Sequence, residues 1–271
     1  MPLAVCATPI GNLDDVTLRV LRELREADVV LAEDTRHTGL LLARHKIDAR
    51  LLSYHEHNEA ARVAEILPRL EAGERVALVS DAGLPGISDP GARLVRAAVD
   101  AGVPVTVLPG PSAVETALVV SGLVSDRYAF VGFLPRRGKE LDALWADLDS
   151  WAWPVVAFES AQRLPLSLRS LASVAPARDV VVCRELTKQF EEVVRGTAAE
   201  LADRFEEPPR GEITLVFGPS AGEAGRAAEE AEAAAVAVGE LIAAGTPRKA
   251  AADVVSRLTG VPRNALYREG L

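Results

Sequence analysis

The sequence of 271 residues has few of the features that mark secreted, membrane-spanning or disulfide-rich proteins. It contains two cysteines, Cys6 and Cys183, and each lies in an apolar run that reads as a buried strand. We interpret both as small, reduced core residues rather than as catalytic thiols. No run of about 18 apolar residues is present, and the first residues lack the basic start and long apolar stretch of a secretory signal. These absences predict no membrane span and a cytoplasmic location.

Aromatic residues and positive charge are also scarce. Aromatic side chains make up 4% of the sequence, which disfavours a binding surface built from stacked aromatics. The formal net charge is −9, whereas proteins that bind nucleic acid by coating its phosphates are usually basic. Any contact with RNA or DNA must therefore come from local basic patches on an acidic body.

The common phosphate-binding motifs are missing. No G-x-x-x-x-G-K-[ST] motif is present, and no G-x-G-x-x-G motif follows an apolar strand. Residues 7–13, ATPIGNL, carry one proline and one glycine where a pyrophosphate loop would carry several glycines. This weakens the case for a nucleotide triphosphatase or a dinucleotide-dependent oxidoreductase. A small ligand with a carboxylate, a ribose and an adenine would suit such loops.

The order of apolar runs and helical patterns predicts an α/β protein with several domains. Residues 1–121 alternate short apolar strands with helices, as expected for a parallel sheet covered on both faces. Residues 122–220 have more strands per helix, which predicts a second α/β domain with a mixed sheet. Residues 221–245 read as an Ala/Glu-rich helix or tether, and residues 246–271 as a small helix-turn-helix-like domain. A tail that packs on the body or on a partner subunit is the alternative for that last segment.

Ligands of open α/β sheets bind beyond the carboxyl ends of the strands, so the loops that follow the strands are the candidate site. In SDAGLPGISDPG, residues 80–91, Asp81 offers a carboxylate to a ribose hydroxyl or a cationic group. We interpret Asp89 in the same loop as the cap of the next helix. Ser112 begins another helix whose exposed N–H groups suit an anion, although a helix cap alone would also explain it.

Several short motifs then support a family resemblance. Over residues 7–217 the chain contains, in order, TPIGNL, AEDTRHTGLLL, HEHNE, VSDAGLPGISDPG, LPGPSA, GFLPR, FESAQRL, RELTK and GEITLVF. Together they resemble the 16S ribosomal RNA (cytidine-2′-O)-methyltransferase family, a branch of the tetrapyrrole-methylase superfamily, and the C-terminal TPRKAAADVVSRLTGVPRNALY resembles that family's small helical domain. Leu84 departs from the pattern, because a threonine is expected after SDAG.

The resemblance implies two α/β domains of the class III methyltransferase type, with S-adenosylmethionine in the cleft between them and a homodimer as the assembly. It implies methylation of the ribose 2′-oxygen of a cytidine in the decoding region of 16S rRNA in the small ribosomal subunit. The cofactor contacts that it implies are Pro9, Gly11, Ser80, Asp81, Ala82, Gly83, Gly110, Ser112, Ala113, Phe158 and Thr214. Two alternatives stay open: methylation of a tetrapyrrole or another small molecule, and a non-catalytic RNA-binding protein of ribosome assembly.

Methyl transfer to a hydroxyl calls for a proton acceptor or a cation that stabilises the alkoxide. The candidates are Asp34 and His37 in EDTRHT, and Lys188 in RELTK. The H-x-H spacing of HEHNE invites a metal site, but no further ligands lie nearby and we expect none. The residues expected to contact RNA are Arg36, His57, Asn58, Arg136, Arg137, Lys139, Glu185, Arg248 and Lys249.

Overall fold

The computed structural model describes residues 2–220, 222–263 and 266, and it divides into two compact units. The first unit comprises Met1–Leu141 and Pro154–Gly218, and it contains two five-stranded sheets. The second unit comprises Asp142–Trp153 and Pro219–Leu271 and is helical. We describe each unit by itself.

The first sheet is parallel and has the strand order β3-β2-β4-β1-β5. Its strands are β1 (Leu3–Cys6), β2 (Val29–Ala32), β3 (Leu51–Ser53), β4 (Val76–Val79) and β5 (Val105–Leu108). Every residue of β1, β2 and β4 is buried, because helices cover both faces. The continuous apolar runs that predicted parallel strands are the result of this double cover.

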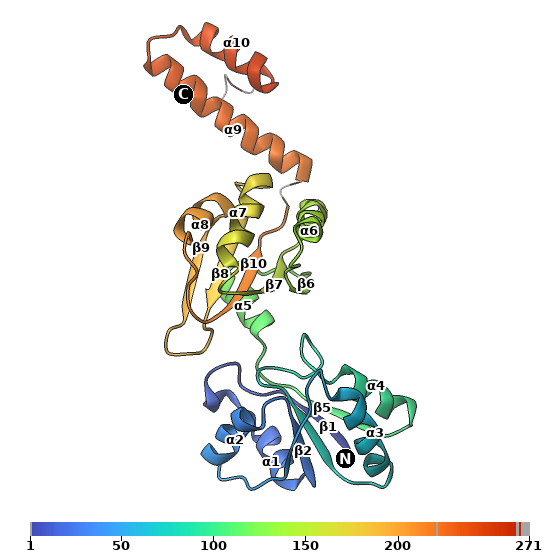
Figure 1. The fold of residues 1–271 in the computed structure, drawn as a ribbon. Coiled ribbons are helices and arrows are strands. Elements are labelled where there is room, and N and C mark those ends of the chain that lie inside the picture. Colours follow the sequence, from blue (N-terminus) through green and yellow to red (C-terminus); the bar gives the residue numbers. More distant parts are fainter. Residues whose placement is uncertain (1, 221, 264–265, 267–271) are drawn as a thin grey trace. The chain divides into compact units, whose positions relative to one another are not determined.

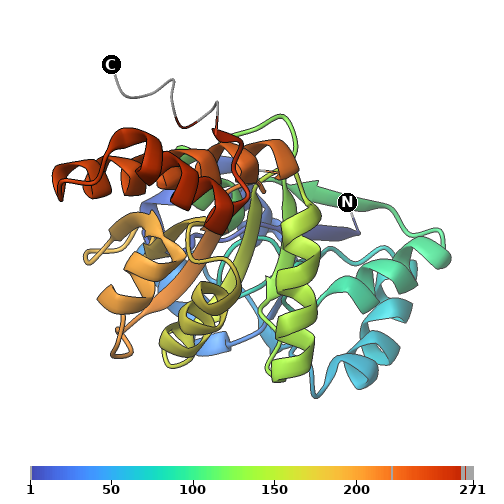
Figure 2. The same ribbon diagram turned by 90° about the horizontal axis from the view of Figure 1, so that it is seen from above.

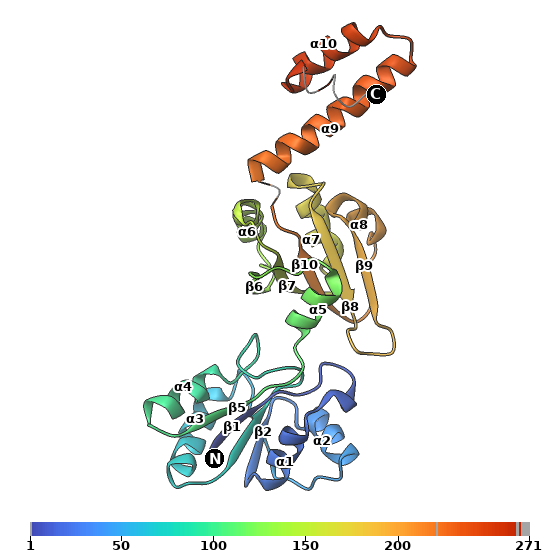
Figure 3. The same cartoon turned by 180° about the vertical axis from the view of Figure 1, so that it is seen from behind.

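Helices cover both faces of this sheet (Figures 1 and 3), and successive residues of β1 pack against different helices. Leu3 and Val5 pack with α3 (Glu59–Glu71) and α4 (Ala92–Asp100), whereas Ala4 and Cys6 pack with α1 (Leu18–Glu26) and α2 (Thr35–Arg44). A short 3-10 helix, η1 (Leu13–Asp15), follows the first loop. Both cysteines are buried and unpaired, and burial raises the pKa of each thiol to about 12.

The second sheet is mixed, with the strand order β6-β7-β10-β8-β9. Only β6 and β7 pair in parallel, and the other neighbours are antiparallel. Helix α5 (Ala113–Ser121) packs on one face of this sheet against Val156, Val181 and Val216. The remaining elements of the region are β6 (Ala129–Phe133), α6 (Gly138–Ser150), β7 (Val155–Ser160), α7 (Leu164–Val174), β8 (Asp179–Arg184), β9 (Glu192–Thr197), α8 (Ala198–Arg204) and β10 (Glu212–Phe217). The predicted α/β class is confirmed, with two sheets of which this second one is mixed.

The second unit contains a long helix, α9 (Gly222–Ala243), followed by α10 (Arg248–Thr259). The two helices lie side by side (Figure 2) and share a small core that includes Val238, Ala251 and Val255. Gly260 ends α10 in the left-handed conformation, with φ of 78°. The second short helix expected near the C-terminus falls largely outside the described residues. Among those residues, no helix combines the length and the apolar character that crossing a bilayer needs.

Candidate active site

The loops that follow the strands of the first sheet are tied to one another. The Thr8 N–H donates to the Gly83 carbonyl at 2.8 Å, and the Gly83 N–H donates to the Thr8 carbonyl at 3.1 Å. The Asp34 N–H donates to Asp81 Oδ1 at 3.0 Å. Three separate strand ends, those of β1, β2 and β4, therefore present one continuous surface of loops.

A cavity of about 470 Å³, called here the larger cavity, opens beside this surface and is lined by residues of both sheets. Seven of the predicted cofactor residues line it: Asp81, Ala82, Gly83, Ser112, Ala113, Phe158 and Thr214. Phe158 and Thr214 are opposite each other on β7 and β10, and the Phe158 ring packs edge-on against Phe130 and Phe133. Leu84, which departs from the family pattern, also lines this cavity.

A second cavity of about 290 Å³, the smaller cavity, adjoins the first. The predicted cofactor residues Pro9, Gly11 and Ser80 line it, together with two catalytic candidates, His37 and Lys188. The two cavities share Ile10, Asp81, Ala82 and Glu212. The two cavities therefore adjoin at these residues.

Two predicted cofactor residues have structural surroundings that the sequence did not indicate. Gly110 lines neither cavity, and a Cβ at this position would lie 2.9 Å from the Ala7 Cβ, so close packing explains this glycine. Ser112 occupies the N-cap position of α5, but its side chain makes no cap hydrogen bond and its Oγ donates to Glu115 instead. The helix-cap interpretation of the Ser112 side chain is therefore wrong.

The helix-cap interpretation of Asp89 is also wrong. Gly91, with φ of 140°, is the N-cap residue of α4, while Asp89 lines the larger cavity. The residue before it, Ser88, has φ of 62°, a conformation that non-glycine residues adopt mainly where the surroundings impose it. Burial, reinforced by the charge of Glu33, raises the pKa of Asp89 to about 7, although a hydrogen bond with Ser80 lowers it.

The larger cavity carries an excess of negative charge. Its lining includes the carboxylates of Glu33, Asp81, Asp89, Glu159 and Glu212, and no lysine, arginine or histidine is among its lining residues, all of which the structure describes. Arg163 neutralises Glu159 and Lys188 neutralises Glu212, which leaves the other carboxylates without such a partner in the cavity wall. Burial raises the pKa of Glu33 more than the hydrogen bond from the Asp81 N–H lowers it. Such a wall favours a cationic ligand.

The raised pKa of Asp89 predicts a pH dependence of stability. An unfolded aspartate titrates near pH 3.9, so between about pH 4 and pH 7 the folded state holds more protons than the unfolded state. The free energy of unfolding contributed by Asp89 should therefore fall as the pH rises through this range. We expect Asp89→Asn to be more stable than the parent protein at pH 8, with the difference vanishing near pH 4. Urea unfolding at both pH values measures this, and Asp48→Asn, at an exposed position, is the control.

Asp34 does not fit the role of a proton acceptor. It is the N-cap of α2, where Oδ1 accepts the Arg36 N–H at 2.8 Å and Oδ2 lies 2.6 Å from Arg36 Nη2. Hydrogen bonds and the charge of Arg36 hold the pKa of Asp34 well below its usual range. Asp34 lines neither cavity. The Arg36 guanidinium, expected to bind RNA, is held by this same carboxylate.

Lys188 lies in a turn that is held from several sides. Its Nζ is 3.0 Å from Glu185 Oε1 and 2.9 Å from Glu212 Oε2. Burial works to lower the pKa of Lys188, but hydrogen bonds to Glu212 and Glu185 outweigh it and raise this pKa. Lys188 is therefore a fixed cation at neutral pH rather than a base. Glu185, expected to contact RNA, is engaged internally, because it also accepts the Glu212 N–H at 2.9 Å.

The Lys188 turn also contacts the first loop of the protein. Thr187, with φ of 65°, accepts the Asn12 N–H at 3.0 Å through its Oγ1. A Cβ on Gly11 would lie 2.5 Å from Lys188 Cγ and 2.7 Å from Thr187 Oγ1. Only glycine lets the two loops approach this closely, which explains the glycine of TPIGN in physical terms.

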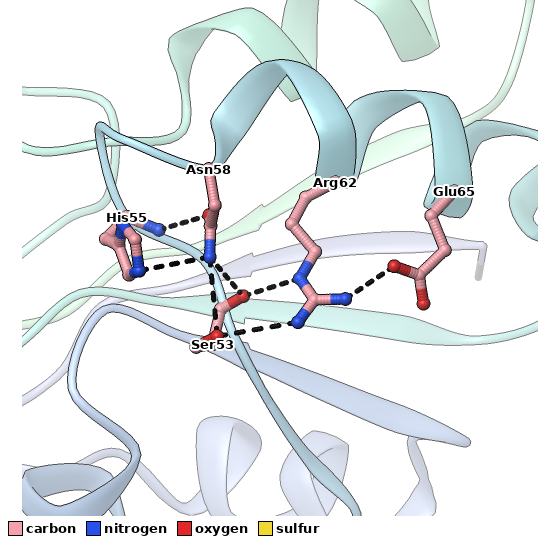
Figure 4. Close-up of polar contacts among 5 residues, drawn as sticks. All are labelled: Ser53, His55, Asn58, Arg62 and Glu65. Carbon is pink, nitrogen blue, oxygen red and sulfur yellow. Dashed lines mark hydrogen bonds and ion pairs between the residues drawn. The ribbon is translucent and has the colours of Figure 1, made fainter.

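Residues of the HEHNE motif close a loop through polar contacts with Ser53 and Arg62 (Figure 4). Asn58 Oδ1 accepts the His55 N–H at 2.9 Å, and Asn58 Nδ2 donates to the Ser53 carbonyl at 3.2 Å. Arg62 Nε also donates to that carbonyl, at 2.8 Å. The Asn58 side chain is thus used inside the protein, whereas His57 is exposed. Within the part of the chain that the structure describes, no group of histidine, cysteine and acidic residues could hold a metal ion.

The remaining residues expected to bind RNA are exposed. Arg136, Arg137 and Lys139 lie where β6 connects to α6, and Arg137 pairs with Glu140 at 3.1 Å. Arg248 and Lys249 begin α10 in the second unit.

The sequence interpretation missed Glu33, Asp89 and Glu212 as cavity residues. Each is an acidic residue at or beyond a strand end, which is the signal that points to them.

The fold and its adjoining cavities define an α/β protein with a ligand site beyond the strand ends of its parallel sheet. The model of the family Tetrapyrrole (Corrin/Porphyrin) Methylases matches residues 2–202, and that of the RsmI C-terminal HTH domain matches residues 229–271. The chain is 46% identical over 216 residues to Ribosomal RNA small subunit methyltransferase I of Thermotoga maritima, covering 79% of this chain and 97% of that one. It is 43% identical over 270 residues to the protein of the same name from Micromonospora olivasterospora, covering 98% and 85%. The chain belongs to the ribosomal RNA small subunit methyltransferase I family.

Solved structures agree with this fold. The methyltransferase CobJ superposes with a TM-score of 0.62 at 19% identity, covering 81% of this chain and 94% of that one. Uroporphyrin-III C-methyl transferase from Thermus thermophilus, solved in complex with S-adenyl homocysteine, superposes with a TM-score of 0.57 at 20% identity, covering 80% and 96%. The predictions of a methyltransferase and of S-adenosylmethionine as its cofactor are confirmed.

The residues of the larger cavity fit this cofactor. Its unneutralised carboxylates match the positive charges of a sulfonium and an ammonium, and Asp81 can also accept from ribose hydroxyls. Its apolar wall, which includes Ile87, Phe133 and Phe158, suits an adenine ring. No lysine or arginine that could bind a phosphate is present in this lining.

Proposed function

We propose that the protein methylates the ribose 2′-oxygen of a cytidine in the decoding region of 16S rRNA. The observation that carries this proposal is the pair of adjoining cavities, one suited to a cationic cofactor and the other lined by a fixed ammonium and an imidazole. S-adenosylmethionine supplies a methyl group on an already activated sulfonium. The protein's contribution is therefore mainly to position the two reactants and to handle one proton.

In this proposal the larger cavity holds the cofactor and the smaller cavity receives the ribose. Glu33, Asp81 and Asp89 attract the cationic part of the cofactor, and Phe158 with Thr214 bounds it from the second sheet. The residues shared by the two cavities, among them Ile10 and Ala82, lie where the cofactor and the ribose would meet.

Lys188 and His37 have different roles in the smaller cavity. The Lys188 ammonium, fixed by Glu185 and Glu212, stabilises negative charge as it develops on the 2′-oxygen. The His37 imidazole accepts the proton that the hydroxyl loses. Asp34 has neither role, because it caps α2.

The exposed basic residues supply the RNA surface that an acidic protein otherwise lacks. We assign phosphate contacts to Arg136, Arg137 and Lys139 beside the second sheet, and to Arg248 and Lys249 on α10. In this assignment residues 1–121 and 122–220 form the catalytic domains, residues 221–245 a connecting helix, and residues 246–271 a docking domain. A cytoplasmic homodimer acting on the small ribosomal subunit completes the proposal.

The expected product is directly measurable. Purified protein is incubated with labelled S-adenosylmethionine and either small ribosomal subunits or naked 16S rRNA, and the RNA is digested to nucleosides for mass spectrometry. We expect the label in 2′-O-methylcytidine. Sequencing of the labelled RNA fragment should place this nucleotide in the decoding region. A label on a base, on another nucleoside, or on neither RNA would contradict the proposal.

A further inference from the structure

A buried carboxylate lies at the end of β7, in the wall of the larger cavity. Glu159 is 3% exposed, its Oε2 accepts the Ser167 hydroxyl at 2.5 Å, and its Oε1 accepts the Ser160 N–H at 2.8 Å. Arg163 Nη1 lies 3.3 Å from the same Oε1. A buried carboxylate with this many partners has a fixed position, and it fixes the guanidinium beside it.

The same guanidinium also holds the start of residues 134–139, called here the basic loop. Arg163 Nη1 donates to the Leu134 carbonyl at 3.1 Å, and Arg163 Nη2 donates to the Pro135 carbonyl at 2.5 Å. Leu134 is buried, and its N–H donates to the Phe158 carbonyl at 3.0 Å. The planar fork of arginine thus joins two consecutive carbonyls to the cavity wall, a geometry that a lysine ammonium does not reproduce.

The residues held in this way lie between the cavity and the exposed arginines. Phe133, on one side of the two carbonyls, lines the larger cavity, and Arg136 and Arg137 follow directly on the other. Gly132, with φ of 69°, and an irregular pairing between Phe130 and Phe133 turn the chain at this point. A small shift of the loop would move both exposed guanidinium groups relative to the cavity.

We infer that Arg163 is a positioning residue that holds Arg136 and Arg137 at a fixed place beside the larger cavity. The phosphodiester backbone of a bound RNA is thereby placed correctly for methyl transfer. This inference rests on the proposed function, since it takes RNA as the substrate. It adds a residue that does not itself touch the RNA, and it explains why a buried carboxylate and a partly exposed guanidinium form an ion pair next to an exposed loop.

The test is a cycle of variants measured for binding to unmethylated small ribosomal subunits. Arg163→Lys keeps a positive charge for Glu159 but loses the fork, and we expect about a tenfold weaker Kd for the subunit with cofactor affinity unchanged within about twofold. Arg136→Gln with Arg137→Gln should weaken subunit binding. It should also lower the slope of log K against log salt concentration by the equivalent of about two ionic contacts. Adding Arg163→Lys to that double variant should cause no further loss.

Two controls separate positioning from simple damage. Arg169→Lys, at an exposed site on α7, the helix whose N-cap residue is Arg163, should leave subunit binding unchanged. Glu159→Gln with Arg163→Met removes both charges together, so no unpaired buried charge is left to unfold the protein, and it should show the same subunit-binding defect. The inference would be overturned if Arg163→Lys weakened subunit binding further in the Arg136→Gln, Arg137→Gln double variant. It would also be overturned if Arg163→Lys weakened cofactor binding as much as subunit binding. If the parent protein itself fails to bind or methylate the subunit, the proposed function fails instead.

Discussion

Asp81→Ala should abolish cofactor binding, with Kd for S-adenosylmethionine rising at least about a hundredfold. Asp81 is at the tip of β4, lines both cavities, and is fixed by the Asp34 N–H at 3.0 Å. Its loss removes a charge-assisted contact to the ligand and also the link between two strand ends, and a charged hydrogen bond contributes more than a neutral one.

Calorimetry on the folded variant measures this effect. Asp81→Asn keeps an oxygen for the Asp34 N–H but removes the charge, so we expect an intermediate loss of about tenfold. Asp48→Ala, at an exposed position, should bind the cofactor as the parent does. Unchanged affinity in Asp81→Ala would remove this residue from the site.

Lys188→Met should lower kcat for RNA methylation by about a hundred- to a thousandfold, while Kd for the cofactor stays within about threefold. The ammonium lies in the smaller cavity and is directed by Glu185 and Glu212, so its stabilising effect falls on charge that develops only during the reaction. Single-turnover kinetics with saturating subunits separates this loss from weaker binding.

Removing the cation leaves two carboxylates facing each other, which itself destabilises the turn. Lys188→Met combined with Glu185→Gln avoids that repulsion and should show the same kinetic loss with near-parental thermal stability. Lys46→Met, at an exposed lysine, is the matched control. A variant that loses cofactor affinity as much as kcat would contradict an alkoxide-stabilising role for Lys188.

The first sheet and its strand-end loops were predictable from the sequence. Continuous apolar runs fix which segments become doubly covered strands, and the rule that ligands lie beyond the carboxyl ends then selects Asp81 and the TPIGN loop. Both line cavities in the structure. This part of the prediction depends on local patterning, because each such loop directly follows its own strand.

The contribution of the second sheet was harder to predict, because it depends on strand register and on contacts distant in sequence. Glu212 meets Lys188 only because β10 inserts between β7 and β8, an order that no local pattern encodes.

Asp89 looked like a helix cap because it precedes Pro90, but the positive φ values of Ser88 and Gly91 direct the chain differently. Asn58 was expected to contact RNA, yet its side chain closes the loop around His55.

The central place of β10 has a consequence for the order in which the protein can form during synthesis. The first sheet needs only residues up to Leu108, so it can fold while the rest of the chain is still being translated. The second sheet lacks its middle strand until Glu212–Phe217 has left the ribosome, and until then β7 and β8 have exposed, unpaired edges. A nascent chain that stops short of Gly211 therefore has an incomplete larger cavity, and under the proposed function the methyl donor binds only late in synthesis.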